Sequence, residues 1–394
     1  MHHGKHQKRN KRRRQFLFTL FLLTLISFEI YLLFFKEKQQ NILPQTSTES
    51  SEISKEKTED TEQIKNLNQD VLPSSNLALD INQKLTDASF IGSALVIKDN
   101  QIIMQKGFGY ANASKKIANN SQSVFQIGSS QKGLTAALVL QQVQAQKLSL
   151  DETLDHFYPN IPDSSKITIR QLLSMNSGLV QQEKPTAMMS DEEFLRFEIA
   201  HAQMGTFGEF KYDAINYYLL VGILEKLTGS TYRTLLNQQI IQPLQLHHTS
   251  FYDDFLQLKN RTFAYEKKDN TDYAADIADD PLLFNQEVGT GSLGMTVSDL
   301  YTFYANLLAE KLVNKQTMDS LWTDDKQNKF IGGLYNCGNF IRGHGIEGGF
   351  EAVSYVSKDR KDAIILLTNQ YPKNASYDQL TATLFSQLGP YKTK

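Results

Sequence analysis

The pattern of hydrophobic and polar residues divides the chain into three stretches. Residues 16–35, FLFTLFLLTLISFEIYLLFF, form an apolar run that is long enough to cross a bilayer as a helix. Residues 36–72 are rich in Gln, Glu, Ser, Thr, Lys and Asn and poor in large apolar side chains, which predicts a disordered tether. Residues 73–394 contain apolar segments throughout, and this stretch is predicted to be one large folded domain.

Alternating segments near both ends of this domain predict strands. Residues 93–111, SALVIKDNQIIMQKGFGYA, form a predicted hairpin whose turn falls at Asp99 and Asn100. Residues 352–370, AVSYVSKDRKDAIILLTNQ, form a second predicted hairpin near the C-terminus. Two hairpins of this kind imply an antiparallel sheet.

Helical segments are predicted around this sheet. Amphipathic segments at 77–88 and 376–388 are expected to cover one of its faces. The middle of the chain, about 125 to 320, is mainly helical, and its helix after residue 129 is apolar on nearly every side, so it should lie buried with its N-terminus at a cleft. We therefore predict an α/β fold of the α+β type, in which an antiparallel sheet is flanked by N- and C-terminal helices and joined to a mainly helical lobe.

The N-terminus is predicted to anchor the protein in the cell membrane. A basic run, KHQKRNKRRR at residues 5–14, leads into the apolar run, and lysine and arginine beside a membrane span mark its cytoplasmic side. The one charge inside the run is Glu29, whose cost of about 2.5 to 3.5 kcal/mol is smaller than the roughly 4 to 7 kcal/mol gained from the apolar side chains. We predict a cytoplasmic segment at 1–15, a single transmembrane helix at 16–35 and an extracellular remainder.

Two other interpretations of the N-terminus fit less well. A cleaved signal peptide would carry small residues before the cleavage site, whereas the apolar run ends in LLFFKEKQQ. A nucleic-acid-binding patch would account for the basic run but not for the apolar one. The chain of 394 residues has a formal net charge of −2 and 40% hydrophobic residues, which excludes a strongly basic nucleic-acid binder and a wholly disordered protein.

Neither a cofactor nor a metal ion is predicted. The single cysteine, Cys337, excludes an intramolecular disulfide framework and a cysteine-based metal site. His247 and His248 are adjacent, and no carboxylate cluster joins them to form a metal site. Residues 289–294 spell G-x-G-x-x-G, but no clear parallel strand precedes them, so a dinucleotide site is not expected.

Ser129 and Lys132 carry the strongest chemical signal. They lie three residues apart at the start of the predicted buried helix, so their side chains share a face, and a hydroxyl beside an amine indicates a nucleophile and its base. The helix N-terminus would favour developing negative charge. The pattern alone is weak, because Ser54 and Lys57 in the tether repeat it, and a surface lysine in the first helical turn is an equally good interpretation of Lys132.

Several segments, in the right order, resemble the serine beta-lactamase and penicillin-binding protein superfamily, in its class C and DD-peptidase branch. They are VFQIGSSQKGLTAALV (124–139), KLSLDETLDHFYPNIPDSSKITIRQLLSMNSGL (147–179) and TGSLGMTVSDLYTFYANLL (290–308). The resemblance covers about 75 to 390. It implies a beta-lactamase/transpeptidase-like fold and two-step acyl transfer in which Ser129 attacks a carbonyl.

The second motif of this branch, Y-x-N, aligns with FKYDAINYYLL, which begins at residue 210. The resemblance places the catalytic tyrosine at Tyr212, which would handle the proton of the nucleophile together with Lys132. The asparagine position holds Ala214, which puts amide-type substrates in question. Asn216 is a candidate replacement for substrate binding, although it lies one face further round a helix.

The third motif, a basic residue followed by x-G, falls in NFIRGHGIEGGFEAVSYV. Counting back from the later Gly-Phe pair places it on residues 343–345, with a glycine in the basic position. His344 and Arg342 are therefore the candidates for binding a carboxylate or phosphate, and a packing role for the histidine has nearly equal weight. The resemblance also implies an oxyanion hole from the Ser129 N–H and a strand N–H just beyond Gly345.

A membrane-tethered extracellular domain of this branch would meet two D-alanine polymers in a Gram-positive envelope, teichoic acid and peptidoglycan. Esters need less activation than amides, so a site that keeps Ser129, Lys132 and Tyr212 without the asparagine favours a D-alanyl esterase acting on D-alanylated (lipo)teichoic acid, as relatives of the branch do. The alternatives are a penicillin-binding DD-carboxypeptidase acting on peptidoglycan stem peptides and a non-catalytic protein that binds wall polymer. The oligomeric state is left open.

Overall fold

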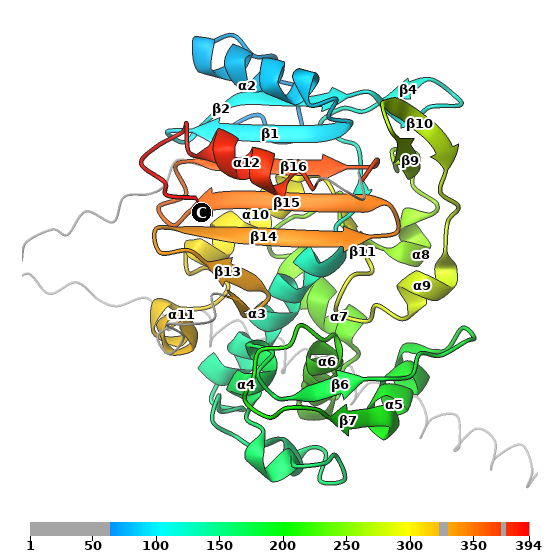
Figure 1. The fold of residues 1–394 in the computed structure, drawn as a ribbon. Helices are drawn as coiled ribbons and strands as arrows, with labels where there is room; N and C mark the ends of the chain where they lie inside the picture. The colour runs from blue at the N-terminus through cyan, green and yellow to red at the C-terminus, as the bar shows by residue number, and fades with distance from the viewer. Residues whose placement is uncertain (1–63, 323–329, 372–375, 394) are drawn as a thin grey trace, which may run out of the picture. The chain divides into compact units, whose positions relative to one another are not determined.

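A seven-stranded sheet forms the centre of the structure, a computed structural model that describes residues 64–322, 330–371 and 376–393 (Figure 1). In spatial order its strands are β12 (Phe330–Ile331), β13 (Leu334–Asn336), β14 (Phe340–Glu347), β15 (Phe350–Ser357), β16 (Ala363–Thr368), β1 (Gly92–Lys98) and β2 (Gln101–Phe108). Every neighbouring pair is antiparallel, which confirms the predicted sheet.

Both predicted hairpins are confirmed. β1 and β2 are joined by a turn at Asp99 and Asn100, whose φ angles of 50° and 64° are those of a tight hairpin turn. β15 and β16 form the second hairpin. β16 also pairs with β1, where Gly92 lies opposite Thr368, so segments from the two ends of the domain meet inside the sheet.

Two helices cover one face of the sheet, as their amphipathic sequences predicted. They are α2 (Asn76–Asp87) and α12 (Asp378–Phe385) (Figure 1). Ile81 and Leu85, one helical turn apart on α2, are fully buried in the same cluster as Phe385 of α12. Their burial holds the terminal helices on the sheet.

The other face of the sheet packs against the helical part of the domain. Residues 131–140 of α3 (Gln131–Gln144) are all buried there, which confirms the predicted buried helix, and α10 (Val297–Leu308) lies beside it in the same core. The remaining helices are α4 (Ile169–Leu173), α5 (Asp191–His201), α6 (Ile215–Thr228), α7 (Tyr232–Leu236), α8 (Tyr252–Phe255), α9 (Pro281–Asn285) and α11 (Lys315–Trp322). The short strands outside the central sheet are β3 (Tyr110–Asn112), β4 (Ile117–Ala118), β5 (Phe125–Gln126), β6 (Leu179–Gln181), β7 (Ala202–Met204), β8 (Ser250–Phe251), β9 (Tyr265–Lys268), β10 (Thr271–Asp276) and β11 (Leu293–Met295).

Residues 64–72, which their composition assigned to the tether, lie against the folded domain. The Val71 N–H donates to the Gln105 carbonyl at 2.7 Å, and the Gln105 N–H donates back at 2.8 Å. The Asn68 N–H donates to Ser298 Oγ at 2.9 Å. Backbone pairing of this kind leaves little trace in composition, so the folded domain begins earlier than predicted.

The predicted transmembrane helix at 16–35 lies outside the described residues, as do the predicted cytoplasmic segment at 1–15 and the tether at 36–63. Across the described ranges, no helix combines the length and the apolar character that a membrane span requires. The anchor and the tether therefore remain predictions from the sequence.

Candidate active site

Ser129 lies where a short strand meets the buried helix. The strand β5 ends at Gln126, and a 3₁₀ turn, η1 (Gly128–Ser130), leads directly into α3. Gly128 has a φ of 49°, and a Cβ at this position would lie 2.9 Å from the Ile346 backbone nitrogen, so both conformation and space require glycine. The turn thereby holds the partly buried Ser129 side chain beside β14.

Lys132 lies in contact with Ser129, as the helical spacing predicted. Lys132 Nζ donates to Ser129 Oγ at 3.0 Å and to the Thr290 carbonyl at 3.1 Å. The Lys132 residue is 2% exposed, which excludes the interpretation of a surface lysine. In its neutral form, an amine at this distance is placed to accept the hydroxyl proton of Ser129.

The glycine-rich segment at 289–294 positions this lysine. Gly289 has a φ of 73°, and its carbonyl accepts a hydrogen bond from Thr135 Oγ1 at 2.6 Å. The next carbonyl, that of Thr290, accepts the bond from Lys132. The segment continues into β11, which pairs antiparallel with β5 and β8. Its glycines therefore shape a loop that orients the lysine amine.

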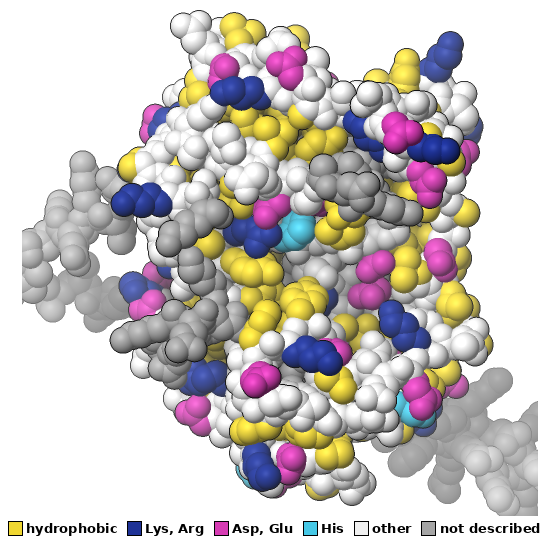
Figure 2. Space-filling view, in the orientation of Figure 1, with side chains coloured by type: hydrophobic (Ala, Val, Ile, Leu, Met, Phe, Trp, Pro, Cys, Tyr) yellow, Lys and Arg dark blue, Asp and Glu magenta, His cyan; other side chains and the backbone are white. Residues whose placement is uncertain are grey.

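The ring of Tyr212 lies beside the Lys132 amine. Lys132 Nζ is 5.4 Å from the centroid of the Tyr212 ring, and this ring packs edge-on against Phe330 with centroids 5.4 Å apart. Phe330 packs in turn against Tyr335, so aromatic rings form one wall of the site. Figure 2 shows hydrophobic side chains gathered in the hollow between the sheet and the helical part. Tyr212 is 45% exposed, so its ring is open to a substrate.

Asn216 does not face the nucleophile. It is 1% exposed, and its Oδ1 accepts a hydrogen bond from Ser177 Oγ at 2.6 Å. Its Nδ2 donates to the Asp213 carbonyl at 2.9 Å, so both ends of the amide are engaged inside the fold. The structure assigns Asn216 to the start of α6, where Ala214 is the N-cap residue, and not to the substrate.

Gly345 lies directly against the nucleophile turn. A Cβ at Gly345 would lie 2.7 Å from the Ser129 backbone nitrogen and 2.1 Å from the Ile127 carbonyl oxygen, so only glycine fits. The Ile346 backbone lies against Gly128 in the same way, because a Cβ at Gly128 would lie 2.9 Å from the Ile346 nitrogen. The structure therefore brings the strand just beyond Gly345 beside the Ser129 N–H, which is the arrangement that an oxyanion hole from these two amides requires.

His344 and Arg342 point to the opposite face of β14, which corrects their predicted place beside the nucleophile. His344 Nε2 lies 2.9 Å from Oε1 of the fully buried Glu351. Arg342 forms two hydrogen bonds of 2.7 Å with the Asp378 carboxylate of α12. Successive strand residues alternate between faces, so neither side chain reaches the face on which Gly345 meets Ser129.

Two carboxylates near Lys132 were not identified from the sequence. Glu287 Oε2 accepts a hydrogen bond of 2.5 Å from Thr290 Oγ1, in the residue whose carbonyl binds Lys132. Glu347 ends β14, and burial together with Glu287 raises its pKa to about 7, while Lys132 opposes this rise. Glu347 belongs to the segment of the third motif, and Glu287 lies two residues before the glycine-rich segment at 289–294. Glu287 and Glu347 lie 60 positions apart in the chain (347 − 287), and the sequence pattern does not show that the fold brings them together.

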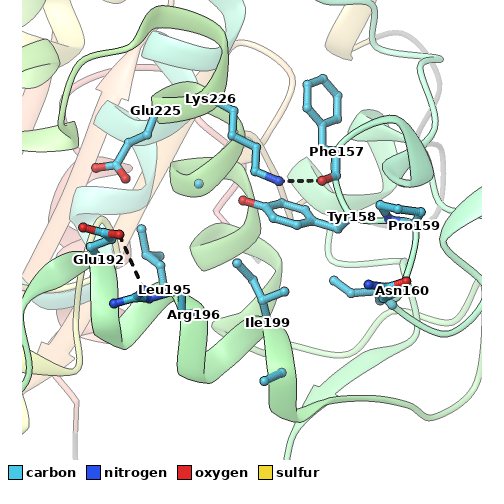
Figure 3. Close-up of a pocket in the computed structure, with 13 residues that line it drawn as sticks. Phe157, Tyr158, Pro159, Asn160, Glu192, Leu195, Arg196, Ile199, Glu225 and Lys226 are labelled. Atoms are coloured by element: carbon cyan, nitrogen blue, oxygen red, sulfur yellow. Dashed lines mark hydrogen bonds and ion pairs between the residues drawn. The ribbon is translucent and has the colours of Figure 1, made fainter.

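A separate pocket of about 840 Å³ lies in the helical part, between residues 157–161, α5 and the C-terminal half of α6 (Figure 3). Lys226 Nζ lies 3.7 Å from the centroid of the Tyr158 ring and donates to the Phe157 carbonyl at 2.5 Å. The pocket is not lined by any of the predicted site residues, so the candidate active site remains the one at Ser129. Within the described residues, no group of three or more His, Cys, Asp or Glu side chains could hold a metal ion.

The sheet, the helix behind it and the Ser-Lys-Tyr group at their junction define a serine hydrolase of the beta-lactamase type. The beta-lactamase family model matches residues 81–388, and the chain belongs to this family. The matched region contains all of the candidate catalytic residues.

Two relatives and one solved structure are similar to this chain. PbpX of Bacillus subtilis, which is named as a penicillin-binding protein, is 26% identical over 317 residues, or 79% of each chain. The teichoic acid D-alanine hydrolase of Staphylococcus aureus is 26% identical over 322 residues, which cover 80% of this chain and 79% of that protein. The crystal structure of FmtA from Staphylococcus aureus has a TM-score of 0.72 and 24% identity, and the match covers 82% of this chain and 93% of that one. The similarity to the FmtA structure shows a shared fold.

Proposed function

We propose that the protein hydrolyses D-alanyl esters of teichoic acid at the outer cell surface. The observation that carries this proposal is the Ser129–Lys132 contact of 3.0 Å in a site where Ala214 occupies the position of the amide-binding asparagine. The relative named teichoic acid D-alanine hydrolase, which matches over 80% of this chain, supports the choice of substrate. An ester carbonyl needs less activation than an amide carbonyl, so an esterase tolerates the loss of that asparagine.

The reaction begins with attack of Ser129 Oγ on the ester carbonyl. The hydroxyl proton passes to the Lys132 amine, 3.0 Å away, and Tyr212, whose ring lies beside this amine, shares in its transfer. The negative charge on the carbonyl oxygen is stabilised by the N–H groups of Ser129 and Ile346. Collapse of this intermediate breaks the ester bond and leaves a D-alanyl group on Ser129.

The second half of the reaction releases D-alanine. As the ester bond breaks, the proton held by Lys132 and Tyr212 passes to the departing polymer oxygen and makes it a hydroxyl, so the site returns to its starting protonation state before water enters. A water molecule then attacks the acyl carbonyl, and its proton passes through Lys132 and Tyr212 to the departing Ser129 oxygen. Ser129 is thereby regenerated. The products are free D-alanine and a polymer hydroxyl, which balances the hydrolysis.

The location outside the cell belongs to the same proposal. The basic run followed by a predominantly apolar stretch of 20 residues supports a single-pass anchor with its N-terminus inside. The polar stretch from residue 36 would give the hydrolase domain reach into the wall, where teichoic acid lies. A cytoplasmic location would separate the enzyme from this polymer.

A DD-carboxypeptidase acting on peptidoglycan is the second candidate, because PbpX is named as a penicillin-binding protein. The two functions are separated by measuring D-alanine release from D-alanylated lipoteichoic acid and, in parallel, from a muropeptide ending in D-Ala-D-Ala. The full chain and its Ser129→Ala variant are compared. Release from lipoteichoic acid alone that depends on Ser129 is the expected result. Release from the muropeptide alone would establish the carboxypeptidase, and release from neither would overturn both functions.

A further inference from the structure

Glu347 points to the same side of the sheet as the nucleophile. It lies two residues beyond Gly345, so the two positions share a face of β14, and Gly345 meets Ser129 on that face. The strand partner of Glu347 is Phe350, which belongs to the core on this same side. The Glu347 carboxylate therefore belongs to the active-site side, opposite to that of Arg342 and His344.

Glu287 brings a second carboxylate close to Glu347. Its Oε2 atom is held by Thr290 Oγ1 at 2.5 Å, while the Thr290 carbonyl binds Lys132. Glu287 raises the pKa of Glu347, whereas Lys132 and Lys184 lower it, so a second acid and two lysines act on the Glu347 carboxylate. Figure 2 shows acidic side chains at the edge of the hollow below the sheet.

The two basic side chains of the third motif are paired with acids away from the nucleophile. Arg342 is paired with Asp378, and His344 lies against Glu351, both on the far face of β14. Within the ranges that the structure describes, no salt bridge joins Glu347 or Glu287 to a basic side chain. Lys132 and Lys184 both act on Glu347 without forming an ion pair with it, so the carboxylates of Glu347 and Glu287 remain available to a substrate cation.

We propose that Glu347, with Glu287 beside it, binds the α-ammonium group of an aminoacyl ester and makes the site selective for an unblocked amino group. This inference rests on the proposed function, because a D-alanyl ester carries such an ammonium one carbon from the reacting carbonyl. A peptidoglycan stem, in contrast, presents an acylated nitrogen at that carbon and a terminal carboxylate. A carboxylate close to the nucleophile would attract the first substrate and repel the second.

The test uses a matched pair of small esters, 1-O-(D-alanyl)glycerol and its N-acetyl form, which differ only in the charge of the amino group. The wild-type full chain is expected to favour the free amine by about tenfold or more in kcat/KM, the range expected for a charge-assisted contact in a partly buried site. Glu347→Gln should lower kcat/KM for the free amine by about tenfold and leave the N-acetyl ester nearly unchanged. Glu287→Gln should act in the same direction, and Glu347→Asp should restore part of the preference.

Glu192→Gln is the matched control, because Glu192 lines the separate pocket and its side chain is 79% exposed. It should leave the ratio between the two esters unchanged. Equal hydrolysis of the two esters by the wild type would overturn the inference. An equal loss on both esters in Glu347→Gln would do the same, since it would assign Glu347 to general base catalysis or to the fold. Failure of the proposed function is a different result: no D-alanine released from lipoteichoic acid, whichever small ester is preferred.

Discussion

The amine of Lys132 lies 3.0 Å from the hydroxyl of Ser129, and the helix α3 that carries Lys132 and follows the Ser129 turn directly is buried along its first ten positions. The pair is therefore fixed before a substrate arrives. Its other partner, the Thr290 carbonyl at 3.1 Å, holds the amine without adding a competing acid at this distance. This geometry makes Lys132 the central residue for testing proton transfer.

Lys132→Met should lower kcat/KM for a small ester by about 10² to 10⁴, because methionine fills similar space but cannot accept the Ser129 proton. Hydrolysis and covalent labelling of Ser129 by a fluorophosphonate should fall together. Lys226→Met is the matched control, since Lys226 lines the separate pocket, and its kcat/KM should stay within about twofold of wild type. Normal labelling in Lys132→Met would contradict the role of this lysine.

Tyr212→Phe removes one hydroxyl from a half-exposed ring. The phenylalanine keeps the packing against Phe330, so the melting temperature should not change, while kcat should fall by about tenfold or more through loss of a proton-transfer group. Steady-state kinetics with both ester and amide substrates measures the effect. Tyr110→Phe, at another exposed tyrosine, is the control. Unchanged kcat in Tyr212→Phe would leave Lys132 as the sole proton carrier.

Much of this site follows from local sequence rules. The contact between Ser129 and Lys132 is a consequence of helical spacing, and the buried helix and both hairpins follow from the apolar pattern. The third motif shows the limit of such rules. Strand alternation places Arg342 and His344 on one face and Gly345 on the other, but only the packing of η1 against Gly345 reveals which face meets the nucleophile.

The residues that the sequence pattern missed are brought to the site by tertiary contacts. Glu287 is linked to Lys132 through Thr290, whose side chain binds Glu287 and whose carbonyl binds Lys132. Thr290 and Lys132 lie 158 positions apart in the chain. Asn216 illustrates the reverse case, in which a plausible polar residue is used inside the fold by Ser177. A side chain of the right type near a motif is therefore insufficient, because strand and helix faces must be assigned first.

Arg342→Met tests the corrected place of this residue. The guanidinium makes two bonds to Asp378, so its loss leaves a partly buried carboxylate with the hydrogen bond from the Tyr355 hydroxyl but without its charged partner, and it should lower the free energy of unfolding by about 1 to 3 kcal/mol. Urea denaturation measures this change. KM for a D-alanyl ester should remain within about twofold of wild type. A large rise in KM without loss of stability would instead restore the sequence-based hypothesis that Arg342 binds substrate.

Glu198→Gln should stabilise the protein at alkaline pH. Glu198 is 1% exposed, and burial, with Asp213 nearby, raises its pKa to about 7. A carboxyl whose pKa is raised on folding favours the native state at low pH and loses that contribution as pH rises from about 4.5 to 7. The variant should therefore gain up to about 3 kcal/mol over wild type at about pH 8 and little at about pH 4. Equal gains at both pH values would contradict the buried charge, and Glu192→Gln is the exposed control.

The ester preference should itself depend on pH if Glu347 binds an ammonium group. Burial and Glu287 raise the pKa of Glu347 to about 7 against the opposing effect of Lys132 and Lys184, so this carboxyl is neutral in acid and becomes anionic as pH rises through that value. The α-ammonium of the substrate is lost above about pH 8. The ratio of kcat/KM for the free-amine ester to that for its N-acetyl form should therefore rise through about pH 7 and fall again above about pH 8.

Because both esters share Ser129, Lys132 and Tyr212, their ratio cancels the titration of the catalytic groups. Glu347→Gln should abolish the acidic limb, and an acidic limb that persists in this variant would show that another group, such as Glu287, carries the charge that selects the substrate.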